Sequence, residues 1–239
     1  ALSPNSFGNF EISTILINTS FSKSNENISE TFKNFQNNRL VIAQRLAALN
    51  GDVSGDIDEF GFPIGYGKNN QAVLIPAFIS AYSGKDPNSI SLSAISSTPL
   101  PNWSLQYSGL INLDFFKDRF KRFSIGHSYR SSYTLNSFKS NLEYNSETPS
   151  LKDASGNFLN EILYTNINLV EQFNPLLKID MELKNSIRLV MALKKDRALS
   201  LSLDNDMLTE TSGTDVQAAS TLRKRLNSAN GAPLRNRSR

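Results

Sequence analysis

Residues 176–207 read LLKIDMELKNSIRLVMALKKDRALSLSLDNDM, and an alternation with a period of two runs through them. Leucine, isoleucine and methionine occupy most of the odd positions, whereas charged residues, serine and alanine occupy most of the even ones. Successive side chains of a β-strand point to opposite faces of a sheet. The stretch therefore predicts antiparallel strands with one apolar face and one charged face.

The phase of this alternation also predicts the connections between the strands. A two-residue hairpin reverses the odd/even phase of paired strands, whereas a three-residue loop keeps it. We therefore expect three-residue loops at residues 184–186 and 204–206, unless residues 176–194 form one long strand.

Two environments suit such a sheet. In a soluble sandwich the charged face meets bulk water, whereas in an outer-membrane barrel the apolar face meets lipid and the charged face lines the lumen. Periodicity alone does not choose between them. For the barrel, the lipid-facing candidates are Leu177, Ile179, Met181, Leu183, Ile187, Leu189, Met191, Leu193, Leu199, Leu201 and Leu203. The lumen-facing candidates are Lys178, Asp180, Glu182, Lys184 and Arg188.

Further strands are expected upstream. Residues 10–21 are rich in Ile, Thr and Phe, and residues 103–107 alternate between large apolar and polar side chains. A short amphipathic turn or helix, residues 113–123, separates this second strand from a long one at residues 124–144, where His127 shares a face with the tyrosines.

Two helices are expected between the first two of these strands. Apolar residues recur at helical spacing from Phe32 to Leu49, with Ser29 as the N-cap and Asn50-Gly51 as the stop. Residues 70–82 predict a second helix, in which Pro76 should produce a kink or leave only the last turns regular.

Composition argues against most enzymatic chemistry. The 239 residues include no cysteine and one histidine, which excludes thiolate nucleophiles and multi-histidine metal sites. The longest apolar run, residues 72–79, is too short for a membrane-spanning helix. The acidic loop 51–70 fails as an EF-hand starting at Asp52, because Ile57 and Pro63 stand where glycine and glutamate are required. We expect no enzyme activity, no cofactor and no tightly bound metal.

Individual reactive residues have simpler interpretations. No GxSxG motif accompanies His127, so a packed or interfacial histidine is favoured over a general base. Asp180 and Glu182 share a strand face, but Lys178 and Lys184 flank them, which favours a charge-balanced wall.

The two ends of the chain stand apart from this pattern. The start, Ala1-Leu2-Ser3-Pro4, shows neither a basic leader nor an apolar signal core, so we expect a mature chain or an internal piece of a longer one. Residues 221–239 carry six cations and no acid, while the preceding residues are slightly acidic. Residues 213–239 lack alternation, and we expect a disordered basic tail there. With no aromatic residue to stack on bases, this tail does not predict nucleic-acid binding.

Several stretches together resemble the C-terminal part of the SprA/Sov family, the outer-membrane translocon of the type IX secretion system. They are FQNNRLVIAQRLA (35–47), GFPIGYGKNNQAVLIPAFISAYSGKDP (61–87), PNWSLQYSGL (101–110), GHSYRSSYT (126–134), EQFNPLLKIDMELKN (171–185) and LSLSLDNDMLTE (199–210). They cover most of residues 7–210 in family order. After about Ser212 the chain departs from the family pattern, which continues into another strand.

The resemblance implies a wall segment of a giant barrel that exports surface proteins and supports gliding motility. Its implied fold is mainly β with a few helices, an antiparallel transmembrane barrel segment that does not close alone. Residues 1–100 would form a strand and a helical insert associated with the lumen, 101–212 the barrel strands and 213–239 the tail. Implied partners are the remaining strands, a plug protein, a PorV-type shuttle barrel, secreted cargo and outer-membrane lipid. The alternative is a soluble β-rich surface binding or adhesin domain.

Overall fold

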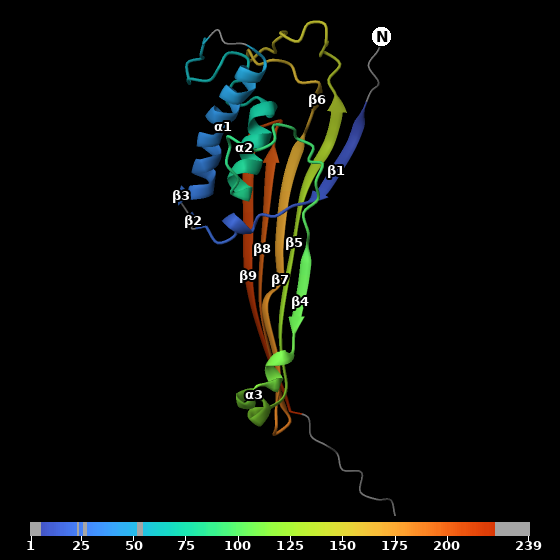
Figure 1. Ribbon diagram of the computed structural model, residues 1–239. Helices are drawn as coiled ribbons and strands as arrows, with labels where there is room; N and C mark the ends of the chain where they lie inside the picture. The colour runs from blue at the N-terminus through green and yellow to red at the C-terminus, as the bar shows by residue number, and fades with distance from the viewer. Residues whose placement is uncertain (1–5, 23, 26–27, 52–54, 223–239) are drawn as a thin grey trace, which may run out of the picture.

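The computed structural model describes residues 6–22, 24–25, 28–51 and 55–222, which form a mainly β structure with three α-helices and an open antiparallel sheet. Long strands run the length of an elongated molecule, with α1 and α2 against one half of the sheet and α3 at the other end (Figure 1). The elements in chain order are β1 (Phe7–Ser13), η1 (Ile17–Thr19), β2 (Ser24–Asn25), β3 (Ile28–Ser29), α1 (Glu30–Leu49), α2 (Gln71–Ser83), β4 (Trp103–Tyr107), η2 (Gly109–Asn112), α3 (Asp114–Arg119), β5 (Phe120–Ser140), β6 (Ile162–Leu163), β7 (Asn166–Leu183), β8 (Ile187–Ser202) and β9 (Met207–Leu222).

The main sheet has the order β1-β5-β7-β8-β9, and all of its pairings are antiparallel. β4 pairs with the first half of β5, and β1 pairs with its second half, so both lie along the same side of β5. The predicted strand at residues 103–107 and the long strand following α3 are confirmed, the latter with shifted ends. The amphipathic segment predicted at residues 113–123 contains α3.

The first connection expected from the alternation is confirmed, and the second is wrong. β7 and β8 are joined by residues 184–186, and odd residues pair with odd ones, as in Met181 with Leu189. β8 and β9 are joined by four residues, 203–206, because Ser202 pairs with Met207. A four-residue loop reverses the phase, so even residues of β9 share the face of odd residues of β8.

The expected disordered tail is wrong for residues 213–222, because β9 continues through them to Leu222. β9 pairs with β8 residue by residue without a register shift, from Ser202–Met207 to Ile187–Leu222. Backbone pairing does not require alternation of hydrophobic residues, so the sequence pattern gave no sign of this strand. Residues 223–239 lie outside the described residues.

Both predicted helices are confirmed. In α1 the Ser29 side chain accepts a hydrogen bond from the Phe32 amide, as expected for an N-cap. In α2 the Asn70 side chain accepts one from the Ala72 amide. α2 is continuous from Gln71 to Ser83, so the expectation that only its last turns would be regular is wrong. Pro76 lies near the helix start, where it removes a single intrahelical bond.

The main hydrophobic core lies between these helices and one half of the sheet. Phe78 and Tyr82 of α2 pack in one cluster with Leu169, Leu199 and Leu201, and the last two are 1% exposed. The lipid-facing assignment of Leu199, Leu201 and Leu203 is therefore wrong: the first two are covered by the helices, and Leu203 lies in the loop and packs against the same core.

The first predicted strand is shorter than expected. β1 ends at Ser13, and residues 14–22, the crossing segment, then pass over the face of the sheet on which the helices pack (Figure 1). The Leu16 amide donates to the Tyr129 hydroxyl of β5, and Ser20 Oγ donates to Glu171 of β7. The crossing segment thus marks the border of the helix-covered half.

Candidate functional site: the uncovered half of the sheet

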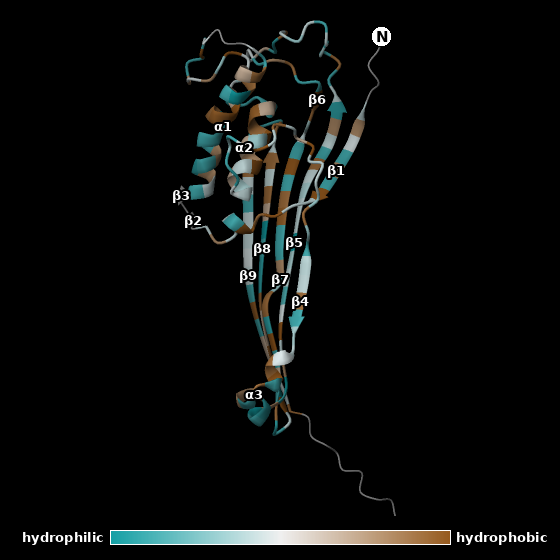
Figure 2. Ribbon diagram, in the orientation of Figure 1, coloured by the Kyte–Doolittle hydropathy of each residue, from teal (hydrophilic) through white to brown (hydrophobic). Residues whose placement is uncertain are grey.

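Beyond the crossing segment, the helix-bearing face of the sheet continues as an uncovered apolar surface, here called the apolar band. Figure 2 shows apolar and polar residues alternating along β7 and β8. Leu177 and Met191 are each 42% exposed and Val216 is 75% exposed. The band comprises Leu177, Ile179, Met181 and Leu183 of β7, Ile187, Leu189, Met191 and Leu193 of β8, and Val216, Ala218 and Leu222 of β9.

The height of the apolar band matches a membrane dimension. Residues 177–183, 187–193 and 216–222 lie side by side, and each stretch has seven residues. At about 3.3 Å per residue this gives roughly 23 Å along the strands. The apolar belt of outer-membrane barrels is about 25 Å tall.

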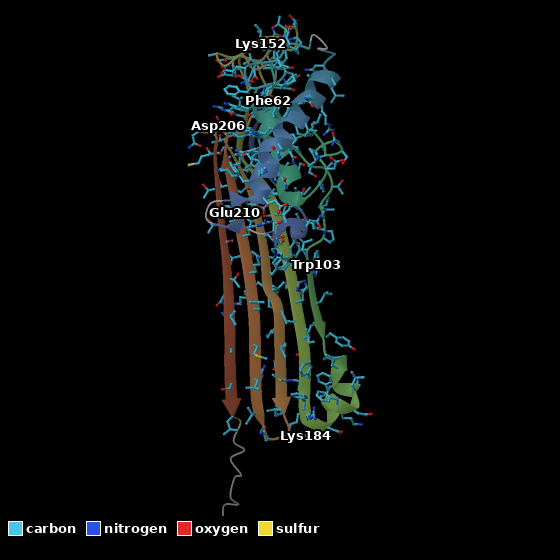
Figure 3. The ribbon with its side chains drawn as sticks, turned by 90° about the vertical axis from the view of Figure 1, so that its left-hand side faces the viewer. Phe62, Trp103, Lys152, Lys184, Asp206 and Glu210 are labelled. Atoms are coloured by element: carbon cyan, nitrogen blue, oxygen red, sulfur yellow. The ribbon has the colours of Figure 1, made fainter. Side chains whose placement is uncertain are left out.

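Aromatic side chains gather at the upper border of the apolar band, next to the crossing segment. Trp103 stacks on Tyr129 with ring centroids 4.5 Å apart, and Tyr129 lies 4.9 Å from Phe173. The His127 ring lies 6.2 Å from Phe173, and its Nδ1 is 2.7 Å from the Leu176 carbonyl oxygen. His127 is thus packed among aromatic rings, in keeping with its interpretation as a packed or interfacial residue. In Figure 3, Trp103 lies between Asp206 and Lys184, which mark opposite ends of the strands.

A second aromatic group lies at the lower border, around α3. Phe116 packs edge-on against Phe123 at 4.7 Å and against Phe115 at 5.3 Å. Phe120 lies 5.4 Å from Phe123. Aromatic residues thus lie at both ends of the apolar band, with Tyr129 and Phe173 buried at the upper end and Phe115 exposed at the lower end.

The opposite face of the same strands is charged. Arg188 of β8 donates from Nε to Asp180 of β7 at 3.0 Å, and Arg122 of β5 is 3.6 Å from Asp180. Lys121 lies 4.0 Å from Glu182. The charge-balanced wall is therefore present, but residues on neighbouring strands provide these ion pairs rather than the flanking lysines.

Four of the five lumen-facing candidates, Lys178, Asp180, Glu182 and Arg188, share this charged face. Lys184 does not, because it lies in the loop between β7 and β8.

A buried ion pair at the upper border was missed by sequence reasoning. Arg197 and Glu171 lie 3.3 Å apart on the apolar face and are 5% and 1% exposed. The Tyr129 hydroxyl donates to Glu171, and Arg197 donates to Thr19 of the crossing segment. The available signal was that Glu171 and Arg197 interrupt the apolar series of their strands. The pair anchors the crossing segment to β7 and β8.

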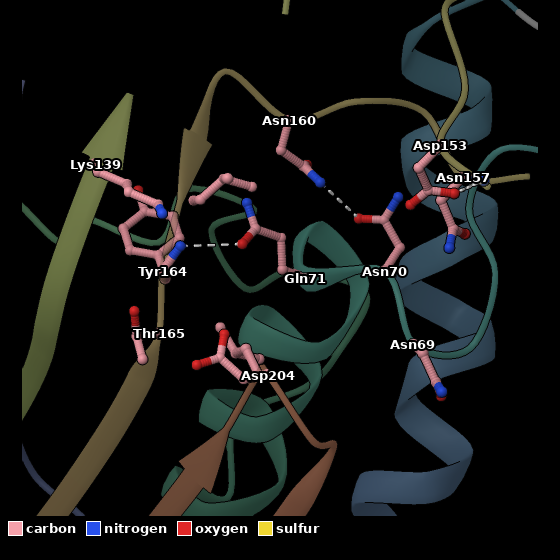
Figure 4. A pocket seen from close by; sticks show the side chains of 12 residues that line it. Asn69, Asn70, Gln71, Lys139, Asp153, Asn157, Asn160, Tyr164, Thr165 and Asp204 are labelled. Atoms are coloured by element: carbon pink, nitrogen blue, oxygen red, sulfur yellow. Dashed lines mark hydrogen bonds between the residues drawn. The ribbon is translucent and has the colours of Figure 1, made fainter. Parts of the chain in front are cut away.

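A polar cleft of about 320 Å³ lies between the start of α2 and the adjacent ends of the strands. Figure 4 shows that its side-chain amides bind one another and nearby backbone. Asn160 donates to the Asn70 side chain, and Gln71 accepts from the Tyr164 amide. These hydrogen bonds hold the loops against the start of α2, so we assign the cleft a structural role.

Among the described residues, none of the helices combines the length and apolar content needed to cross a membrane. Within the same residues, no group of three or more acidic or histidine side chains is arranged to hold a metal ion. Asp52, from which the calcium loop was tested, lies outside the described residues.

The position of the helices bears on two expectations from the sequence, that the helices lie in the lumen and that the apolar strand face meets lipid. α1 and α2 pack on the face that carries the apolar band, and the charged side chains occupy the other face. The helices and the charged lining therefore lie on opposite sides of the sheet. A lumen position for the helices is incompatible with a lipid position for the apolar band on this same face.

Comparison with protein-family models and with curated proteins finds no match.

Proposed function

We propose that this chain is a wall segment of an outer-membrane barrel through which proteins are exported. The observation that carries the proposal is the apolar band, about 23 Å tall and backed by a charged face. In this arrangement lipid covers the apolar band and the face with Asp180 and Arg188 lines a water-filled lumen. The resemblance of the sequence to the type IX translocon family supports export of surface proteins and a role in gliding motility.

The proposal places α1 and α2 outside the lumen. They cover the part of the sheet that extends beyond the apolar band, so their apolar faces are buried against β7 and β8 rather than in lipid. This replaces the expectation of helices inside the barrel. The plug protein, the PorV-type shuttle barrel and cargo remain the partners proposed from the resemblance.

The open sheet gives the remaining barrel strands a place to pair. Among the described residues, no strand pairs with the outer side of β9. β9 carries two acids, Glu210 and Asp215, but it contains no lysine, arginine or proline and no bulge, which are common protections of an exposed edge. Further strands of the same barrel would hydrogen-bond the free backbone N–H and C=O groups of β9, for which lipid offers no partners.

The soluble β-rich binding domain is the competing function. It would leave the apolar band in water, although exposed apolar patches of this kind usually mark an interaction surface. The experiment is fractionation of cells that express the chain, with an alkaline carbonate wash and detergent extraction of the membranes. The wall segment is expected to resist the wash and to need detergent. Recovery of a soluble monomer would contradict it.

A further inference from the structure

Both borders of the apolar band carry cations. At the upper border, the Lys195 ammonium lies 4.4 Å over the Phe21 ring. At the lower border, residues 113–123 and 182–186 contain five cations and three acids. The cations are Lys117, Arg119, Lys121, Arg122 and Lys184, and the acids are Asp114, Asp118 and Glu182.

A backbone hydrogen bond brings two of these cations, Arg119 and Lys184, to neighbouring positions. The Lys184 amide donates to the Arg119 carbonyl oxygen at 3.3 Å, and Lys121 Nζ donates to Ser186 Oγ at 2.8 Å. The loop 184–186 therefore lies against the junction of α3 and β5. Arg122 and Lys121 are directed instead to Asp180 and Glu182 on the charged face, at 3.6 and 4.0 Å.

Exposed apolar side chains lie beside Arg119. Phe115 and Leu113 are both more than half exposed, and the Arg119 guanidinium lies 4.0 Å over the Phe115 ring. Phe116 connects Phe115 to the buried Phe123 at the end of the apolar band. Cations beside exposed aromatic rings suit the boundary between lipid tails and headgroups.

We propose that Arg119 and Lys184 form a binding surface for the phosphates of anionic lipids at this border of the apolar band. A guanidinium binds phosphate oxygens through two parallel hydrogen bonds, and the lysine adds a point charge. Free phosphate would leave Phe115 and Leu113 in water, whereas a lipid covers them with its acyl chains. The inference rests on the proposed function and names the lipid class for one border.

The test is flotation of the full 239-residue chain with vesicles of phosphatidylcholine alone and of phosphatidylcholine with phosphatidylglycerol. We expect binding to both and stronger binding to the anionic vesicles. The double variant R119Q/K184Q should lose about 25-fold of the binding to anionic vesicles, since each cation near an anionic surface contributes about fivefold. Its binding to neutral vesicles should stay unchanged.

The matched control is K33Q/K85Q, which removes two cations far from this border and should keep the preference for anionic vesicles. A chain that ends at Leu222 should also bind anionic vesicles more strongly than neutral ones. If this shorter chain loses the preference, the preference belongs to residues 223–239 and the inference is overturned. Equal binding of the native chain to both vesicles would overturn the inference alone. Absence of binding to either vesicle would overturn the proposed function as well.

Discussion

At the scale of single residues, the Glu171–Arg197 pair shows how a charged layer is accommodated on an apolar sheet face. Both side chains are almost fully buried, and the crossing segment supplies the Ser20 hydroxyl to Glu171 and the Thr19 carbonyl to Arg197. A buried charge is tolerated when it is paired and hydrogen-bonded. The pair therefore makes the position of the crossing segment depend on two strands at once.

Removing one member of this pair is expected to cost far more than removing both. Arg197→Leu leaves Glu171 buried without its counter-ion and should lower the free energy of unfolding by about 3–5 kcal/mol. The double variant Glu171→Leu/Arg197→Leu should recover much of this loss. Urea unfolding in detergent measures the effect, with Arg188→Leu at the more exposed pair as a control that should cost clearly less. Equal losses for Arg197→Leu and Arg188→Leu would contradict the buried-pair account.

The stability of the fold should depend on pH through the buried Tyr82. Burial in α2 raises the pKa of its hydroxyl above the ordinary value, the charge of Glu210 raises it further, and Arg197 lowers it. The unfolded chain releases this proton near pH 10 while the folded chain retains it, so stability is unaffected below about pH 10 and falls above it. Unfolding at pH 8 and pH 11 should show a smaller alkaline loss for Tyr82→Phe than for the native chain. The exposed Tyr107→Phe is the control, and an equal benefit from it would refute the assignment.

At the scale of elements, β8 runs from the apolar band into the helix-covered half, and the same substitution should have a different cost in each half. Leu201 is buried against α2, so Leu201→Ala leaves a cavity and should cost about 2–5 kcal/mol. Leu193→Ala, in the uncovered band, leaves no enclosed cavity and should cost clearly less in detergent. Denaturant midpoints measure both. Similar costs at both positions would mean that the helices do not cover β8 as described.

The two faces of β8 should also differ in a membrane. Leu189 lies on the apolar band and Ala192 on the charged face. Arginine near the midplane of a bilayer costs about 2–4 kcal/mol on the lipid face of a barrel strand and much less on the lumen side. Leu189→Arg is therefore expected to impair membrane assembly more than Ala192→Arg, measured as the heat-resistant, membrane-integrated fraction. Equal tolerance of both would reject the topology.

Sequence alone predicted a large part of these elements. The alternation predicted β7, β8, their loop and the charged face, because strand periodicity depends on neighbouring residues. It did not distinguish Leu199 from Leu189, since coverage by α2 depends on a segment more than a hundred residues away in the chain. The end of β9 was missed because its polar sequence is held by backbone pairing with β8.

At the scale of the whole molecule, the exposed edge of β9 should make the chain self-associate when the rest of a barrel is missing. Ala219→Lys places a charge on this edge strand and is expected to reduce association measured by sedimentation in detergent. Ala192→Lys adds the same charge on the same face of an interior strand and should have little effect. If both variants reduce self-association equally, the added charge and not its place on the edge strand is the cause, which would contradict the prediction.

The central claim is that one sheet face is divided into a helix-covered half and a lipid-facing half, and spin labels along β8 test it most directly. The chain contains no cysteine, so single cysteines at each position from 187 to 201 give unambiguous labelling. In vesicles, labels at 187, 189, 191 and 193 should be accessible to oxygen in the lipid, and labels at 188, 190, 192 and 194 to a water-soluble relaxation agent. Labels at 199 and 201 should be protected from both. Equal access of the water-soluble agent to odd and even positions between 187 and 194 would contradict the account.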